Sequence, residues 1–142
     1  MILVDANILL FACDSASPHH ERARAWVEEA LNGEETVGLA LASLLAFVRI
    51  GSDPRVFRRP FHTPGGVEIV ASWLSRSNVV VAQPTDGRWD ALARVARLGK
   101  ARGSLVMDAH LASLALEHGA TLFTTDRDFA RFPGLRSRDP LA

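Results

Sequence analysis

Short apolar runs alternate with longer segments of helical periodicity along the chain, and this alternation limits the possible folds more than any other feature. Apolar runs at residues 2–4, 36–41, 79–82 and 121–124 have the length and composition of buried strands. The chain between successive runs is long enough for one or more helices. Strands that alternate with helices favour a mostly parallel sheet covered on both faces, so we predict an α/β fold.

Helices are expected where apolar residues recur every three or four positions. They cover residues 19–31, 43–49, 63–74, 84–102 and 106–118, after a helical turn that begins at Asn7. Ser43 and Thr63 are suited to cap two of these helices, and Gly119 is suited to the left-handed position that ends a helix. The periodicity of the helix at 84–102 places Trp89 on its buried face.

Length and composition indicate an ordinary globular protein. The 142 residues fit a single domain, and an apolar content of 48% disfavours disorder. The only cysteine, Cys13, excludes an intramolecular disulfide scaffold and suits a reducing compartment. No apolar run reaches the roughly 18 to 20 residues that span a membrane. We therefore expect a soluble, cytoplasmic protein with no membrane partner.

The net charge of zero hides an uneven distribution along the chain. Residues 1–46 carry seven acidic and two basic residues, whereas residues 47–107 carry four acidic and ten basic residues. Arginine accounts for 15 of the 16 basic residues. Its guanidinium binds phosphates well, although a GC-rich genome produces the same bias. The basic middle of the chain is therefore compatible with a phosphate-bearing partner but does not establish one.

Three aspartates occupy positions where an open parallel sheet collects functional groups. Asp5 ends the first strand, Asp126 follows the strand at 121–124, and Asp108 lies in the first turn of the last helix. Such groups gather beyond the carboxyl ends of the strands, where the strand order reverses. If the first and last of these strands are neighbours, Asp5 and Asp126 face one crevice. Each aspartate alone could equally cap a turn or a helix.

In order and spacing, the motifs around these aspartates resemble the PIN-domain nucleases, and closely the VapC toxins of bacterial toxin–antitoxin pairs. The motifs are Asp5-Ala6-Asn7, Val106-Met107-Asp108-Ala109-His110 and Thr124-Thr125-Asp126-Arg127-Asp128-Phe129, followed by Phe132-Pro133-Gly134-Leu135. The resemblance covers nearly the whole chain. It implies one PIN-like domain over residues 1–142, folded as a three-layer α/β/α sandwich with a mostly parallel central sheet. It also implies a metal-dependent endoribonuclease, a homodimer and a cognate VapB-type antitoxin.

The chain departs from the family pattern at one acidic position. The family has a glutamate on the helix after the second strand, in a pattern like Ala-Glu-Phe-Leu-Arg. Here Leu45-Ala46-Phe47-Val48-Arg49 places Ala46 at that position. The loss of this carboxylate should mainly weaken a second metal site of the kind used in two-metal hydrolysis.

The remaining acids predict a magnesium site. Carboxylates in one crevice repel one another and raise one another's pKa unless a cation neutralises them. Mg²⁺ takes oxygen ligands and commonly uses one or two carboxylates plus substrate phosphate, so three aspartates suffice for one ion, with Mn²⁺ as the alternative. We predict that Asp5 and Asp108 hold the ion and that Asp126 is a ligand or a nearby acceptor. An activated water then attacks the RNA phosphodiester.

Supporting roles are predicted for residues near these acids. Asn7 and Thr124 are expected to orient Asp5 or a bound water by hydrogen bonding. Asp128 either caps a turn or lies at the edge of the metal site. Candidate RNA phosphate contacts, which would weaken as salt is added, are Arg49, Arg97 and Arg102.

Two other interpretations remain open. Because Ala46 replaces the glutamate, the chain could be a PIN fold that binds RNA or its antitoxin without cutting. A strand ending in aspartate also begins the haloacid-dehalogenase-like phosphatases. Those enzymes need a second aspartate where this chain has Asn7, and a lysine for which Lys100 is the only candidate.

Overall fold

The computed structural model describes residues 1–86 and 88–142 and contains one all-parallel sheet. Its five strands follow the order β3-β2-β1-β4-β5. They are β1 (Ile2–Val4), β2 (Val37–Ala40), β3 (Val79–Ala82), β4 (Thr121–Phe123) and β5 (Ser137–Arg138). β1 pairs with β2 on one side and with β4 on the other. The strand order reverses at β1, so the carboxyl ends of β1 and β4 flank the predicted crevice.

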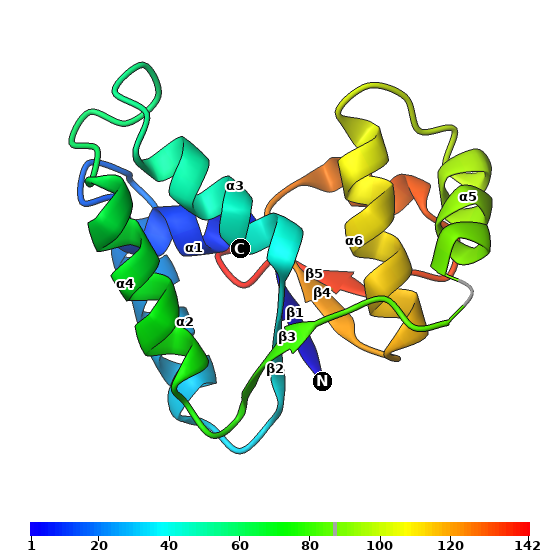
Figure 1. Ribbon diagram of the computed structural model, residues 1–142, viewed down its shortest axis with the longest axis horizontal. Coiled ribbons are helices and arrows are strands. Elements are labelled where there is room, and N and C mark those ends of the chain that lie inside the picture. Colours follow the sequence, from blue (N-terminus) through cyan, green and yellow to red (C-terminus); the bar gives the residue numbers. More distant parts are fainter. Residues whose placement is uncertain (87) are drawn as a thin grey trace.

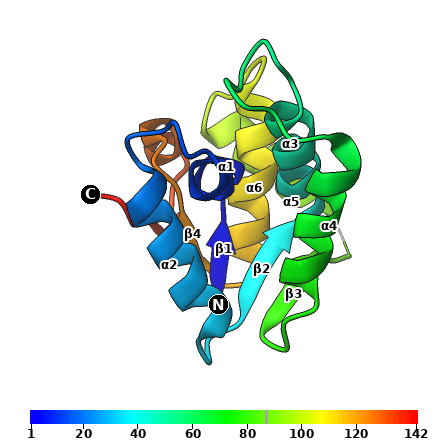
Figure 2. The same ribbon diagram turned by 90° about the vertical axis from the view of Figure 1, so that its left-hand side faces the viewer.

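Helices cover both faces of this sheet, as Figures 1 and 2 show. One layer contains α1 (Ala6–Cys13), α2 (His20–Asn32), α3 (Leu41–Gly51) and α4 (Thr63–Leu74), and the other contains α5 (Arg88–Leu98) and α6 (Leu105–Glu117). The predicted α/β/α sandwich with a parallel sheet is therefore confirmed. Figure 2 views the side of the first layer, with β1 between β4 and β2.

The alternation of side chains along the strands builds a separate core on each face. Successive residues of a strand point to opposite faces. Val4 and Leu39 pack with the helices α1 to α4, whereas Leu3 and Leu122 pack with α5 and α6. Both faces of the central strands are thus buried, which explains why these strands are continuous apolar runs.

Several predicted details of the helices are wrong. Ser43 does not cap α3, because β2 leads directly into a helix that begins at Leu41, and Ser43 is buried in its first turn. Thr63 is the first residue of α4, and His62 occupies the cap position. Trp89 is 73% exposed, because α5 packs on the core through Leu92, Val95 and Ala96 instead.

The predicted helix at 84–102 is shorter in the structure. It ends at Leu98, and Lys100 then adopts a positive φ of 51°. Its predicted start includes residue 87, which lies outside the described residues. The predicted helix end at Gly119 is confirmed, since this residue has a φ of 60° after α6.

None of the helices in the described part of the chain is both long enough and apolar enough to cross a membrane.

Candidate active site

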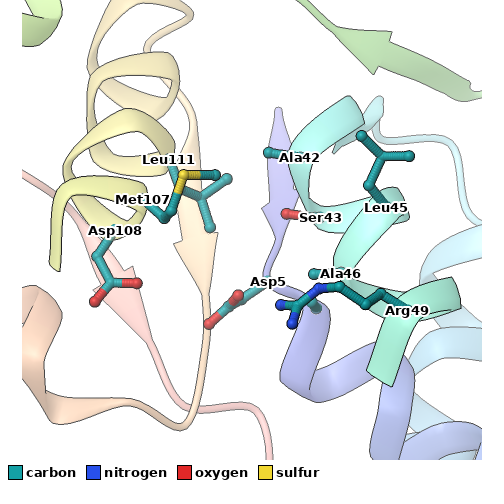
Figure 3. A pocket seen from close by; sticks show the side chains of 10 residues that line it. Asp5, Ala42, Ser43, Leu45, Ala46, Arg49, Met107, Asp108 and Leu111 are labelled. Carbon is teal, nitrogen blue, oxygen red and sulfur yellow. The ribbon is translucent and has the colours of Figure 1, made fainter. Parts of the chain in front are cut away.

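A cleft of about 320 Å³ lies at the carboxyl end of β1, between α3 and α6 (Figure 3). Asp5 lies between the two helices, next to Ala6. The wall formed by α6 contributes Met107, Asp108 and Leu111. The wall formed by α3 contributes Ala42, Ser43, Leu45, Ala46 and Arg49. Two of the three predicted acids, Asp5 and Asp108, therefore line one cleft from different elements.

Asp5 is held in place by the segment that follows β4. Its backbone N–H donates to Phe123 O at 3.0 Å, which continues the β1–β4 pairing beyond the strands. The Thr124 hydroxyl donates to Asp5 Oδ2 at 2.7 Å. Burial raises the pKa of the Asp5 carboxyl, and the hydrogen bonds from Thr124 and from the backbone of Ala6 oppose this rise. These hydrogen bonds thus hold Asp5 in place and favour its charged form, whereas burial and the nearby Asp126 disfavour it.

Asn7 reaches Asp5 through Thr124. Its Nδ2 donates to Thr124 Oγ1 at 3.3 Å and to Thr125 Oγ1 at 3.1 Å. Thr124 Oγ1 also accepts from the backbone N–H of Asp126 at 3.0 Å. The structure thus brings Asn7 and Thr124 together beside Asp5. Asn7 Oδ1 is buried and has no partner in the described part of the chain, so it can accept a hydrogen bond from a water.

Asp108 lies in the first turn of α6 and is surrounded by like charge. Its pKa is raised to about 6 by burial and by repulsion from Asp126, Asp5 and Asp128, and it is lowered by Arg131. An acid with this pKa is only partly protonated near neutral pH. A cation that binds here would replace its proton and relieve the repulsion.

Asp126 and Asp128 lie beside the cleft and are exposed. Asp126 Oδ1 accepts from the backbone N–H of Asp128 at 2.8 Å, so Asp126 caps the short 3₁₀ helix η1 (Arg127–Arg131). It is still near enough to raise the pKa of both Asp5 and Asp108. Asp128 lies 4.0 Å from Arg131, between Oδ1 and Nη2. The structure therefore places Asp126 at the edge of the cleft, where it also caps a turn.

The chemistry of the cleft fits a hard cation. In the part of the chain described, no three His, Cys, Asp or Glu side chains gather closely enough to hold a metal ion by themselves. The groups that line the cleft and could bind a metal are the carboxylates of Asp5 and Asp108 and the hydroxyl of Ser43. Mg²⁺ typically binds such sites through one or two carboxylates, completing its shell with water and substrate phosphate.

Ala46 lines the cleft beside Arg49, so the departure from the family pattern lies at the site itself (Figure 3). Of the three arginines predicted to contact RNA, Arg49 lines the cleft. Arg97 is exposed on α5, and Arg102 is exposed between α5 and α6, and neither lines the cleft.

Sequence reasoning missed Arg131. Its Nη1 donates to Gly99 O at 3.2 Å, which ties η1 to the end of α5 and holds a positive charge near Asp108. The three-residue spacing from Asp128 within one helical turn was the available signal.

Comparisons with known proteins agree with this geometry. The PIN domain model matches residues 2–135. Ribonuclease VapC37 of Mycobacterium tuberculosis is 42% identical over 142 residues, which cover 100% of this chain and 99% of that protein. Ribonuclease VapC33 of the same organism is 37% identical over 142 residues, with 99% of each chain covered. The crystal structure of VapBC2 from Rickettsia felis, bound to a DNA fragment from its promoter, has a similar fold, with a TM-score of 0.67 at 16% identity over 97% of this chain and 98% of that chain. The chain therefore belongs to the PIN-domain family and is a VapC-type member of it.

Proposed function

We propose that the chain is the toxin of a VapBC-type pair and a metal-dependent endoribonuclease that hydrolyses RNA phosphodiesters. The observation that carries this proposal is the pair of carboxylates, Asp5 and Asp108, that line one cleft at the switch point of the sheet. Burial first, and then repulsion by neighbouring carboxylates, raises the pKa of each carboxyl, so a bound cation would stabilise the charged form of both. The relatives named ribonuclease support RNA as the substrate.

In this proposal Asp5 and Asp108 hold Mg²⁺, or Mn²⁺, and Asp126, at the edge of the cleft, accepts a hydrogen bond from a water bound to the ion. When bound, the ion would polarise the scissile phosphate and lower the pKa of the attacking water. Thr124 keeps the Asp5 carboxylate oriented through its 2.7 Å hydrogen bond, and Asn7 in turn donates to Thr124. Asp108 must lose its proton to act as a ligand, so the affinity for Mg²⁺ should weaken as the pH falls through about 6.

A cleavage assay on total RNA tests the proposal. We expect the purified protein to cut RNA with Mg²⁺ and to stop when EDTA is added. Asp108→Asn should lower the rate by about a hundredfold or more, because metal ligands contribute at least as much as the groups that orient them. Asp90→Asn removes the same charge from the exposed surface of α5 and serves as the matched control. If Asp108→Asn cuts as fast as the wild type, the proposed site is wrong.

A second candidate function is a PIN fold that binds RNA or its antitoxin without cutting. The observation that favours it is Ala46, whose methyl group lines the cleft where the family pattern has a carboxylate. The variant Ala46→Glu separates the two candidates in the same assay. If the wild type is inert with Mg²⁺ while Ala46→Glu cuts, the native chain is a binding module.

We also propose a VapB-type antitoxin and a second copy of the chain as partners. Large apolar side chains are exposed on both helices beside the cleft, including Leu45 at 62% and Met107 at 58%. Exposed apolar side chains that gather in this way are typical of protein interfaces. Light scattering during size exclusion should give the mass of a dimer. A small protein encoded beside this chain should copurify with it and block RNA cleavage.

A further inference from the structure

Arg49 is the one positively charged residue among those that line the cleft of the described structure. It lies one helical turn after Ala46 on α3. Figure 3 shows its guanidinium beside the methyl group of Ala46 and turned toward Asp5. Its position thus places a cation at the mouth of a cleft whose other charged groups are Asp5 and Asp108.

The guanidinium of Arg49 is not paired with any group of the cleft in the described structure. In the described residues it makes no hydrogen bond and no ion pair. Its charge lowers the pKa of Asp53. Arg131, and not Arg49, is the arginine whose charge lowers the pKa of Asp108. The five N–H donors of Arg49 are therefore available to a ligand that enters the cleft.

The alanine at position 46 explains why this arginine is free. Residues three apart on a helix are neighbours, and an acid and an arginine at that spacing pair with each other. A glutamate at position 46 would therefore be within reach of Arg49. Because this chain has Ala46 instead, the guanidinium of Arg49 faces the cleft without an acidic partner at position 46.

We propose that Arg49 is a substrate-binding residue that holds a backbone phosphate of RNA beside Asp5 and Asp108, and that Ala46 keeps its guanidinium available for this contact. The inference rests on the proposed function for RNA as the substrate. A phosphate that approaches two carboxylates is repelled by both. A guanidinium offers two parallel N–H donors to phosphate oxygens and supplies the opposing charge.

The test is RNA binding without turnover. A fluorescein-labelled, mixed-sequence, single-stranded RNA oligonucleotide is titrated with the wild type, Arg49→Gln and Arg49→Lys in EDTA, and anisotropy is followed at several salt concentrations. We expect Arg49→Gln to weaken binding by about tenfold and to reduce the salt slope by about one. Arg49→Lys should restore the salt slope but only part of the affinity for RNA. Lysine keeps the positive charge but lacks the two parallel N–H donors of the guanidinium.

Arg94→Gln is the matched control, since Arg94 is exposed on α5 and lies outside the cleft. It removes the same charge without removing the proposed contact. If Arg49→Gln and Arg94→Gln weaken binding equally, the proposal is overturned. It is also overturned if Arg49→Gln leaves RNA binding intact but tightens Mn²⁺ binding, because Arg49 would then act as a counter-ion to the carboxylates.

The role of position 46 is tested by two added carboxylates. Ala46→Glu places an acid within reach of Arg49, whereas Ala42→Glu adds the same charge to the same wall but seven residues from it. We expect Ala46→Glu to weaken RNA binding more than Ala42→Glu does, and we expect this excess to vanish when Arg49→Gln is also present. Equal effects of the two glutamates would overturn the coupling between positions 46 and 49.

These outcomes separate the inference from the proposed function. If the wild type binds RNA through Arg49 but cuts none with Mg²⁺, the nuclease proposal fails and the inference stands. If the wild type cuts RNA while Arg49→Gln binds it as Arg94→Gln does, the inference fails and the nuclease proposal stands.

Discussion

Thr124 is buried and joins three groups of the site through one hydroxyl. It donates to Asp5 Oδ2 at 2.7 Å and accepts from Asn7 Nδ2 and from the backbone N–H of Asp126. Valine has nearly the same shape but cannot make these bonds. We therefore expect Thr124→Val to weaken Mn²⁺ binding, measured by calorimetry, by about 10- to 100-fold.

Two further variants control this prediction. Thr125→Val removes a hydroxyl that accepts from Asn7 at 3.1 Å but leaves the bond between Thr124 and Asp5 intact, so it should have a much smaller effect. Thr124→Ser keeps the hydroxyl and should restore most of the affinity. Equal losses in Thr124→Val and Thr125→Val would argue against a positioning role for Thr124.

The raised pKa of Asp108 predicts how the metal-free protein responds to pH. Asp108 has a pKa of about 6 in the folded chain and an ordinary value of 3.8. The folded state therefore binds this proton more tightly, and the stability that results is present below the ordinary value and is lost as the pH rises through about 6. In EDTA, Asp108→Asn should raise the urea midpoint near pH 7.5 and change it little near pH 4.

The same comparison with Asp90→Asn separates this effect from the loss of a surface charge. Added Mg²⁺ should reduce the advantage of Asp108→Asn at the higher pH, because only the wild type gains stability from the ion. If Asp108→Asn lowers the urea midpoint equally at both pH values, the protein does not raise the pKa of this carboxyl.

At the scale of elements, the end of α6 depends on a backbone conformation that favours glycine. Gly119 has a φ of 60°, and a Cβ at this position would meet nothing within 4 Å. Any cost of Gly119→Ala thus comes from the backbone alone, and we expect a loss of about 1 kcal/mol in the free energy of unfolding. Urea denaturation measures it.

Gly65→Ala is the matched substitution for Gly119→Ala. A Cβ on Gly65 also meets nothing within 4 Å, but Gly65 lies inside α4 with no positive φ. Alanine there should stabilise the protein by about 0.5 kcal/mol, because it lowers the entropy of the unfolded chain. A gain in stability for Gly119→Ala would contradict the left-handed helix end.

The sequence predicts an element where its apolar residues form an uninterrupted run or a clear periodic pattern. β3 was predicted over residues 79–82, because four small or branched apolar residues follow one another there. β5 was not predicted, because Ser137 and Arg138 are exposed and carry no apolar signal. Periodicity indicates which face of a helix is buried but not how far along the helix the packing extends, so it wrongly predicts that Trp89 is buried.

At the scale of the whole molecule, the sequence predicts the acids of the site better than their surroundings. Asp5 and Asp126 could be placed together because each follows a parallel strand, and parallel strands put their carboxyl ends at one edge of the sheet. Asp108 lies in the first turn of α6 and was joined to them by the order and spacing of the motifs. The cleft wall could not be predicted, since it depends on how α3 and α6 pack across the sheet. For the same reason the positions of Arg49 in the cleft and of Arg131 near Asp108 emerged only from the structure.

If this cleft hydrolyses RNA by attack of water, cleavage in water enriched in heavy oxygen will label the products. Attack by water places one solvent oxygen on the product phosphate, whereas attack by the ribose hydroxyl leaves a cyclic phosphate without solvent oxygen. We predict that mass spectrometry finds solvent oxygen on linear product phosphates when Mg²⁺ is present, no products with EDTA, and product formed at least about a hundredfold more slowly with Asp108→Asn. Cyclic phosphate ends, or equal cleavage by Asp108→Asn, would contradict hydrolysis in this cleft.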